Sequence, residues 1–375
     1  MTFVTGFWPP EALGRSWRST DVYMRLFEEL DATLTGPLVI FIEPQLADRV
    51  RTVVEKTQSN HARYVIARSY ADLPRVAEKA AYEKLAPIQN GSSAKDTAGA
   101  ALMTWAKPSL VVEVAEENRF DTSHFAWIDF GIAYVADLTG VDFGAIADHA
   151  PEEVRVCEMR ATSPREAADA PNFYRANWGK IAAGFFTGTK ASLRAFDREL
   201  GIEIERMRSV SRIVLEEQLM AAVAAHDPTR YARWYGDYSG ILRNYVRIRR
   251  DADTILDNLA YCREQNLHEQ GVAIVTTLLA SMNERCIRLE PPQAARLLDE
   301  GYTCAFYTDR DLADRLAHIA SALYHYGTGL RDRLDGLGER FRQNLSYRNV
   351  SLETPAWSWD EFARQPDLTA WCSCL

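Results

Sequence analysis

Residues 36–42 read Gly-Pro-Leu-Val-Ile-Phe-Ile, an uninterrupted apolar run behind a helix-stopping Gly-Pro pair. A strand with one face in water would alternate polar and apolar residues, so residues 38–42 predict a central strand that is covered on both faces. Outward from it, β-rich runs occur at 3–7, 63–67 and 124–128, and helical apolar spacing occurs over 19–30 and 45–56. Strands that alternate with helices predict an α/β fold with a mainly parallel sheet.

The pattern of predicted secondary structure changes near Arg250. Before it, residues 180–187 suggest a strand that runs into a turn, and helices are expected from Asp72, over 98–117, and over 189–200 and 211–225. After it, the spacing is helical throughout, over residues 254–265, 272–283, 292–298 and 311–324. We therefore predict an α/β domain over residues 1–247 and an all-helical domain over residues 248–375.

Composition excludes several classes of protein. Lys and Arg number 43 against 52 Asp and Glu, and the formal charge of −9 gives no general attraction to nucleic acid or anionic membranes. The first residues lack the pattern of a secretion signal, and no apolar run in the first half approaches the ~20 residues of a spanning helix. We expect a cytoplasmic protein with reduced, mostly packed thiols, and a frayed end at Cys372 and Cys374.

Asp129 directly follows the β-rich run 124–128. Because ligands of open α/β sheets bind beyond the carboxyl ends of strands, Asp129 is expected to contact a ligand; the alternative is a plain strand-end cap. The sequence Asp-Phe-Gly at 129–131 is not a kinase metal loop, since no H-R-D-x-x-x-x-N precedes it. The run that ends at Lys190 is not a phosphate loop, because its glycines are too close together and Ala191 replaces Ser or Thr. No G-x-S-x-G or H-E-x-x-H sequence indicates a serine hydrolase or zinc enzyme.

Residues 107–132, KPSLVVEVAEENRFDTSHFAWIDFGI, resemble a segment of the HtrL/YibB (WlaTC) family of glycosyltransferase-like proteins. In that family a lysine-containing helix leads through an N-x-F turn to a W-I-D-x-G-I strand. Other family pieces occur in the same order: F-V-T at Phe3–Thr5, G-F-F-x-G at Gly184–Gly188, acidic-E-Q at Glu216–Gln218, and Y-G-D-Y at Tyr235–Tyr238. The resemblance covers most of residues 1–247 and implies a GT-A-like fold that binds a nucleotide sugar.

The resemblance also implies an activity. The expected enzyme moves a sugar from a nucleotide diphosphate, UDP rather than GDP, to a saccharide or other hydroxyl-bearing acceptor. Such a transfer needs carboxylates near the sugar and cations near the leaving group. The helical domain would shape the acceptor side or bind a partner. The alternative is a non-catalytic nucleotide- or glycan-binding module whose helices recruit another protein.

Asp129 is the leading candidate site residue. GT-A enzymes commonly hold Mn²⁺ or Mg²⁺ with a D-x-D sequence, but the third position here is Gly131, so Asp129 is the one expected metal ligand. Asp129 would otherwise accept hydrogen bonds from a ribose or sugar hydroxyl, while Gly131 lets the ligand approach the backbone.

The resemblance implies further donor-site residues, namely Phe3, Thr5, Lys107, Gly184, Phe185 and Asp237. Lys107 would pair with diphosphate oxygens; the alternative is a solvated lysine at a helix end. A turn at Gly184–Gly188 would bring Phe185 against the sugar; the alternative is a pair of core aromatic residues.

The acidic helix supplies the remaining catalytic candidates. Glu217 is expected near the anomeric carbon or the acceptor hydroxyl, with Gln218 as its hydrogen-bonding neighbour. The alternative for Glu216 and Glu217 is a solvated acidic helix face.

Overall fold

The computed structural model describes residues 1–14, 18–92 and 96–326. The chain forms two compact units, of which the first comprises residues 1–158, 162–234 and 238–246. The second comprises residues 159–161, 235–237 and the described residues from 247 onward. The second unit thus includes two three-residue segments that lie within the range predicted for the first domain. Cys372 and Cys374 lie outside the described residues.

Within the described residues, seven strands of the first unit form one sheet in the order β3-β2-β1-β5-β7-β6-β9. The strands β3, β2, β1 and β5 are parallel to one another, whereas β7 runs antiparallel to both β5 and β6. The bounds are β1 Thr2–Phe7, β2 Leu38–Ile42, β3 Arg63–Ala67, β5 His124–Ile128, β6 Val154–Glu158, β7 Ile181–Thr189 and β9 Tyr231–Tyr235. A second, two-stranded sheet pairs β4 Ala86–Pro87 with β8 Arg212–Ile213. The mainly parallel α/β sheet expected from the sequence is confirmed.

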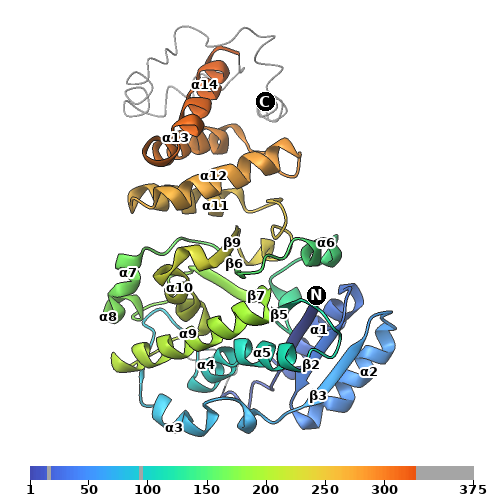
Figure 1. Cartoon of the computed structure of the whole chain (residues 1–375). Coiled ribbons are helices and arrows are strands. Elements are labelled where there is room, and N and C mark those ends of the chain that lie inside the picture. Colours follow the sequence, from blue (N-terminus) through green and yellow to red (C-terminus); the bar gives the residue numbers. More distant parts are fainter. Residues whose placement is uncertain (15–17, 93–95, 327–375) are drawn as a thin grey trace. The chain divides into compact units, whose positions relative to one another are not determined.

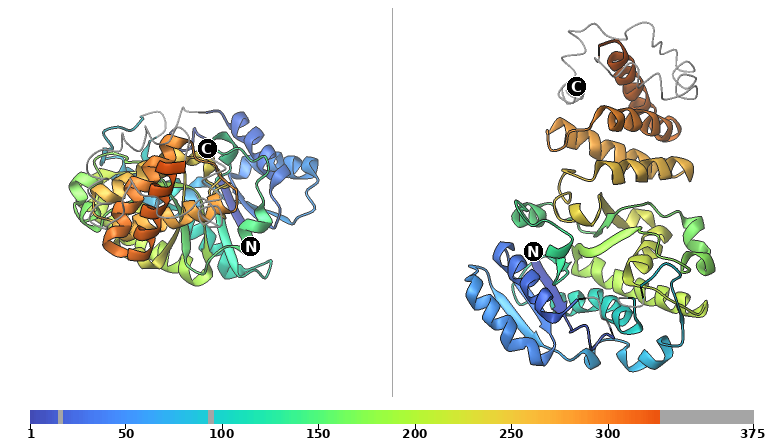
Figure 2. Two further views of the ribbon diagram at one scale, coloured as in Figure 1. Left: turned by 90° about the horizontal axis from the view of Figure 1, so that it is seen from above. Right: turned by 180° about the vertical axis from the view of Figure 1, so that it is seen from behind.

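Helices flank both faces of the large sheet (Figures 1 and 2). Val39 and Phe41 belong to a core shared with α4, α5 and α9, while Phe27 of α1 stacks on Phe130, which in turn stacks on Phe7. Every residue of β2 is buried, as expected for a strand covered on both faces. The helices of this unit are α1 Thr20–Thr33, α2 Ala47–Thr57, α3 Lys79–Tyr82, α4 Ala98–Trp105, α5 Lys107–Glu117, α6 Phe143–Asp148, α7 Pro164–Ala168, α8 Ala170–Phe173, α9 Lys190–Ser209 and α10 Glu216–His226.

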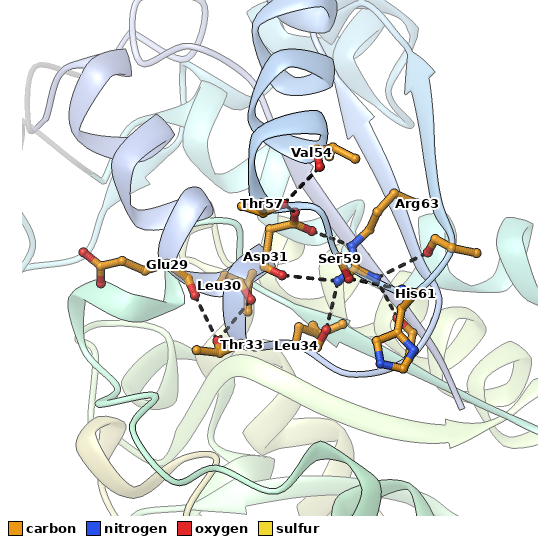
Figure 3. A network of polar contacts seen from close by, with 12 residues as sticks. Glu29, Leu30, Asp31, Thr33, Leu34, Val54, Thr57, Ser59, His61 and Arg63 are labelled. Atoms are coloured by element: carbon orange, nitrogen blue, oxygen red, sulfur yellow. Dashed lines mark hydrogen bonds and ion pairs between the residues drawn. The ribbon is translucent and has the colours of Figure 1, made fainter.

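A buried ion pair fixes the connection from α1 into the sheet (Figure 3). Arg63 of β3 lies 2.5 Å from the Asp31 carboxylate of α1, and both side chains are almost fully buried. Arg63 also donates to the carbonyls of Gly36 and Leu34, and Thr57 donates to Asp31. Since each charge is paired and each guanidinium donor has an acceptor, the pair connects β3 to α1 and to the loop that follows α1.

Several predicted elements of this unit differ from the structure. The helix expected over 211–225 begins only at Glu216 as α10, and Arg212–Ile213 form the short strand β8. The helix expected from Asp72 is two short 3₁₀ turns and the four-residue α3, because Pro74 and the left-handed Arg75 (φ 64°) interrupt it. The helix expected over 98–117 breaks at Ala106 into α4 and α5, with Pro108 near the start of α5. The turn expected at Gly184–Gly188 is part of the continuous strand β7.

The second unit is helical, as predicted. Its helices are α11 Ala252–Glu264, α12 His268–Asn283, α13 Pro291–Thr308 and α14 Arg310–Tyr326, and they share a core of their own. Among the described residues, none of the helices combines the length and apolar composition that a bilayer crossing requires. Cys157, Cys262 and Cys304 are buried free thiols, which agrees with the expected packing.

Candidate functional site

The sheet has a topological switch point between β1 and β5. From β1 the chain continues to β2 and β3 on one side, and β5 then pairs with the other edge of β1. Open α/β sheets bind ligands beyond the carboxyl ends of the strands at such a point. A cavity of about 430 Å³ opens there, and its lining includes Gly6 and Phe7 at the end of β1, Trp8 directly after it, and Asp129 after β5.

One carboxylate oxygen of Asp129 is engaged by neighbouring side chains, and the other accepts no hydrogen bond from the described residues. Oδ1 accepts a hydrogen bond from the Trp127 indole at 2.6 Å and lies 2.8 Å from Lys107 Nζ. Oδ2 accepts no hydrogen bond from the described residues, and the side chain is 38% exposed. A Cβ on Gly184 would lie 3.4 Å from Oδ2, so the missing side chain at 184 keeps this oxygen accessible. Asp129 therefore lines the cavity with an oxygen that can accept from a ligand.

Lys107 is a buried counter-ion and not a solvated helix-end lysine. It begins α5, its side chain is 3% exposed, and Nζ lies 2.8 Å from Asp129 and 2.5 Å from Glu216. Burial lowers the pKa of Lys107, but the Asp129 and Glu216 carboxylates outweigh it and hold that pKa above its usual value. The ammonium is charged and already shared between two carboxylates.

Glu216 and Glu217 begin α10, and neither lies on a solvated acidic face. Glu216 is buried against Lys107, while Glu217 lines the cavity. Glu217 Oε1 accepts from the Tyr238 hydroxyl at 2.5 Å, and Oε2 accepts from the Asn177 amide at 3.2 Å. Burial, and then the neighbouring Glu216, raise the pKa of Glu217 to about 7, although the hydrogen bonds from Tyr238 and Asn177 act in the opposite direction. Glu217 can therefore exchange a proton near neutral pH.

Phe185 does not face the cavity, contrary to the expected contact with a sugar. Its side chain is fully buried and packs edge-to-face against Trp234 and Tyr245 at centroid distances of 6.0 and 5.7 Å. Successive residues of a strand point to opposite faces, so Gly184 lines the cavity and Phe185 points away from it. The alternative of a core aromatic residue is the correct one.

Phe3 and Thr5 are also buried in β1 and do not line the cavity. Phe3 packs edge-to-face on Phe143, and the Thr5 hydroxyl is buried without a hydrogen-bond partner. The later part of β1, at Gly6 and Phe7, reaches the cavity instead.

Gln218 and Asp237 have structural contacts elsewhere. The Gln218 amide donates to the Phe173 carbonyl at 2.9 Å, and its oxygen accepts from the Trp178 N–H at 3.4 Å. Gln218 thus fastens the loop that carries Asn177 and is not among the residues that line the cavity. Asp237 belongs to the second unit, where its N–H donates to Asp251 at 2.9 Å.

The expected metal site has a sparse donor set. No group of three or more His, Cys, Asp or Glu side chains that could hold a metal ion occurs in the described part of the chain. Gly131 supplies no second carboxylate, and a Cβ there would lie 2.9 Å from the Tyr23 ring. One oxygen, Asp129 Oδ2, is accessible, which suits an ion that arrives with phosphate oxygens and water as its other ligands.

Several lining residues have no signal in the sequence. Asn177 and Tyr238 come from separate loops and meet at Glu217, and no spacing rule connects them. Arg18 lies with its guanidinium carbon 3.3 Å from the Tyr134 ring centroid and 5.9 Å from that of Tyr23. The proximity of Arg18 to Tyr134 depends on the folded loops after β1 and β5.

Residues 1–227 match the model of the HtrL_YibB family, described as a bacterial protein of unknown function. No curated protein sequence matches the chain. Among solved structures, mouse xyloside xylosyltransferase 1 in its apo form is similar at 10% identity, over 62% of this chain and 84% of that chain, with a TM-score of 0.36. The family match runs from β1 to the end of α10 and includes Lys107, Asp129 and Glu217.

Proposed function

The chain belongs to the HtrL_YibB family, and we propose that it is a glycosyltransferase that moves a sugar from a nucleotide diphosphate to a hydroxyl-bearing acceptor such as a saccharide. The observation that carries the proposal is Glu217, a carboxylate with a pKa of about 7 in the cavity at the switch point of an open α/β sheet. A UDP-sugar is the proposed donor.

Glu217 is the proposed general base. A base whose pKa lies near the operating pH is strong enough to take the acceptor proton and is still ionised in a substantial fraction of the molecules. Tyr238 and Asn177 each donate to one oxygen of Glu217 and so fix the plane of the carboxylate. Glu216, which is next to Glu217, is paired with Lys107. Its negative charge makes ionisation of Glu217 less favourable, and this raises the affinity of Glu217 for a proton.

Asp129 is the proposed contact to the donor. Its Oδ2 can accept from a sugar or ribose hydroxyl, and it can supply one ligand to a Mg²⁺ or Mn²⁺ ion carried by the diphosphate. Such an ion would neutralise charge on the leaving nucleotide. Lys107 compensates Asp129 and Glu216 and is not proposed as a phosphate ligand, because both carboxylates already surround its ammonium.

The test is release of nucleotide from a panel of UDP- and GDP-sugars, with and without a saccharide acceptor. Glu217→Gln should lower kcat by about 100-fold or more while the Kd for UDP stays within a factor of about two, since a general base contributes about 10²- to 10⁴-fold. Asp129→Asn should lower both turnover and donor affinity. A Glu217→Gln protein that binds UDP poorly but turns over normally would contradict the assigned role.

Removal of divalent ions is a second part of the test. EDTA should slow turnover and Mn²⁺ should restore it, while the Tm stays unchanged because no described cluster holds a structural metal. Turnover that is indifferent to EDTA would remove the ion and leave Asp129 as a hydroxyl acceptor.

The alternative is a non-catalytic binding module, favoured by the single carboxylate that Asp129 supplies where D-x-D would supply two. Binding of UDP or a UDP-sugar without any nucleotide release, across acceptors and with Mn²⁺ present, would support the module over the enzyme.

A further inference from the structure

Asp96 is a further carboxylate in the lining of the cavity, and the proposed transfer gives it no role. It directly precedes Thr97, the residue that caps α4. Asp96 Oδ2 accepts from the Ser92 N–H at 2.6 Å, and the Asp96 N–H donates to the Ser92 carbonyl at 2.7 Å. Oδ1 accepts no hydrogen bond from the described residues. The side chain is thus held by its own loop, and one of its oxygens can accept from a ligand.

The loop that carries Asp96 is fastened to the loop that reaches the proposed base. Asn90 Nδ2 donates to the Asn177 carbonyl at 2.7 Å, and the Asn177 N–H donates to Asn90 Oδ1 at 2.8 Å. The Asn177 side chain in turn donates to Glu217. Asp96 and Glu217 are therefore carried by connected segments, and both line the same cavity of about 430 Å³. A ligand in that cavity is exposed to both charges.

Negative charge exceeds positive charge among the described lining residues. The carboxylates are those of Asp96, Asp129, Glu216 and Glu217, and the cations are Lys107 and Arg18. Since Lys107 is shared between Asp129 and Glu216, it leaves no positive charge in excess there. Arg18 contributes one positive charge against those of Asp96 and the ionised Glu217. A further negative group that enters this cavity is repelled.

Two side-chain donors of the lining are directed at acceptors within the protein. The Lys107 ammonium has three N–H groups, and it lies near three acceptors: Asp129 at 2.8 Å, Glu216 at 2.5 Å and the Ala183 carbonyl at 3.4 Å. The Thr104 hydroxyl donates to a backbone carbonyl of its own helix at 3.0 Å. Neither group has a donor left for a carboxylate on the ligand. A hydroxyl group, by contrast, can donate to the carboxylate oxygens of the lining.

We propose that the cavity selects a donor sugar that is uncharged and rich in hydroxyl groups over the corresponding uronate, and that Asp96 is a specificity-determining residue for this choice. The inference rests on the proposed transferase function and names the class of sugar that it uses. Asp96 Oδ1 accepts from a sugar hydroxyl, and its charge repels a carboxylate on the sugar.

The experiment measures the Kd of the full chain by calorimetry for pairs of nucleotide sugars. The pairs are UDP-glucose with UDP-glucuronate, UDP-galactose with UDP-galacturonate, and GDP-mannose with GDP-mannuronate. Within a pair the nucleotide and the ring are the same, and only a CH₂OH group is exchanged for a carboxylate, so the ratio of the two Kd values isolates that group. The neutral sugar should bind at least about tenfold more tightly, the factor that a like charge at roughly 6 Å gives at an effective dielectric constant of about 40.

Variants of Asp96 test the residue itself. Asp96→Asn keeps an oxygen for the Ser92 N–H and removes the charge, so the ratio should fall by about 3- to 10-fold. Asp96→Glu retains the charge and should retain the ratio within about twofold. Asp48→Asn is the matched control, because that side chain is 96% exposed on α2, and it should leave the ratio unchanged. Thermal melts verify that each variant is folded, and the wild-type ratio tests the selection without any variant.

The outcomes separate this inference from the transferase proposal. Equal binding of both members of a pair by the wild type would overturn the selection for uncharged sugars and leave the transferase proposal standing. A wild-type preference that persists unchanged in a folded Asp96→Asn protein would remove Asp96 from the choice. If the wild type binds neither nucleotides nor nucleotide sugars, the transferase proposal fails and this inference fails with it.

Discussion

At the scale of single residues, the pKa of Glu217 links activity to stability. The folded state raises that pKa from 4.5 to about 7, so the folded protein binds this proton more tightly than the unfolded chain. The stabilisation is fully present below about pH 4.5 and is lost as the pH rises through about 7. A carboxylate suited to proton transfer thus destabilises the fold at the pH where it works.

Glu217→Gln should therefore stabilise the protein in a pH-dependent way. Gln resembles the protonated side chain and cannot ionise, so its advantage in Tm over the wild type should widen from pH 5 to pH 8. Thermal unfolding of both proteins at the two pH values measures this, with Glu55→Gln at an exposed position of α2 as the control. A Tm difference that is the same at both pH values would show that the folded pKa is not raised.

Lys107 allows a test of the buried charges against a matched surface pair. Lys107 begins α5 and pairs with Glu216 in the interior, whereas Lys190 begins α9 and pairs with the half-exposed Glu116 at 3.1 Å. Lys107→Met should cost about 3–5 kcal/mol, because Glu216 is left buried without a counter-ion. Lys190→Met should cost at most about 1 kcal/mol. Urea denaturation of the two variants compares them, and equal costs would mean that Glu216 gains water when Lys107 is removed.

At the scale of elements, the strands β1, β2, β3 and β5 follow from the sequence because their apolar runs are short, dense and bounded by breakers. For strand β7 the sequence predicts a turn at Gly184–Gly188, and this prediction is wrong because the strand is continuous. Neither Gly184 nor Gly188 has a positive φ, so neither is there for a turn. Each lies close to a neighbouring side chain: a Cβ would lie 3.0 Å from Ile132 at position 184 and 2.9 Å from Ser192 at position 188, so a larger residue would displace that neighbour. Tertiary packing of this kind leaves no local pattern.

The same reasoning explains which site residues could be predicted. Asp129 directly follows a strand, so a positional rule is enough to predict it at the carboxyl edge of the sheet, whereas Glu217 is predicted through the family resemblance; both line the cavity. The expected contact of Phe185 with a sugar depends on a turn, whereas in the continuous strand β7 successive side chains alternate between the two faces and Phe185 lies in the core. Arg18 and Tyr134 meet through two loops, and their contact depends on how β1 and β5 pair.

Because adjacent residues of strand β7 lie on opposite faces, we expect substitutions at Gly184 and Phe185 to have different effects on binding and stability. Phe185→Leu should lower the free energy of unfolding by about 1–2 kcal/mol and leave UDP binding unchanged, because the ring packs in the core. Gly184→Ala should weaken binding of the donor sugar, since its Cβ would crowd Asp129 Oδ2 and Ile132. Denaturation and calorimetry of both variants give the two values. A loss of UDP affinity in a well-folded Phe185→Leu protein would place the ring against the ligand after all.

At the scale of the whole molecule, the described residues that line the cavity all belong to the first unit, from Gly6 to Tyr238. The second unit has a separate apolar core formed by α11 to α14, which also includes Ala161 and Tyr235 from the two short inserted segments. Folding of the cavity and folding of the helices are thus supported by different sets of buried side chains.

A chain that ends at Val246 should therefore retain the Kd of the full chain for UDP within a factor of about three, because every described donor-site residue precedes the cut. The cut deprives Ala161 and Tyr235 of their core, so the truncated protein should have a lower Tm and a greater tendency to aggregate. Transfer to a large acceptor should fall more than hydrolysis of the donor if the helices position that acceptor, since positioning acts on the second substrate alone. Calorimetry with UDP and GDP, run beside light scattering and an assay with and without acceptor, separates these effects. A folded, monodisperse truncated protein that binds neither nucleotide, while the full chain binds one, would assign part of the donor site to the helical unit and overturn this division of roles.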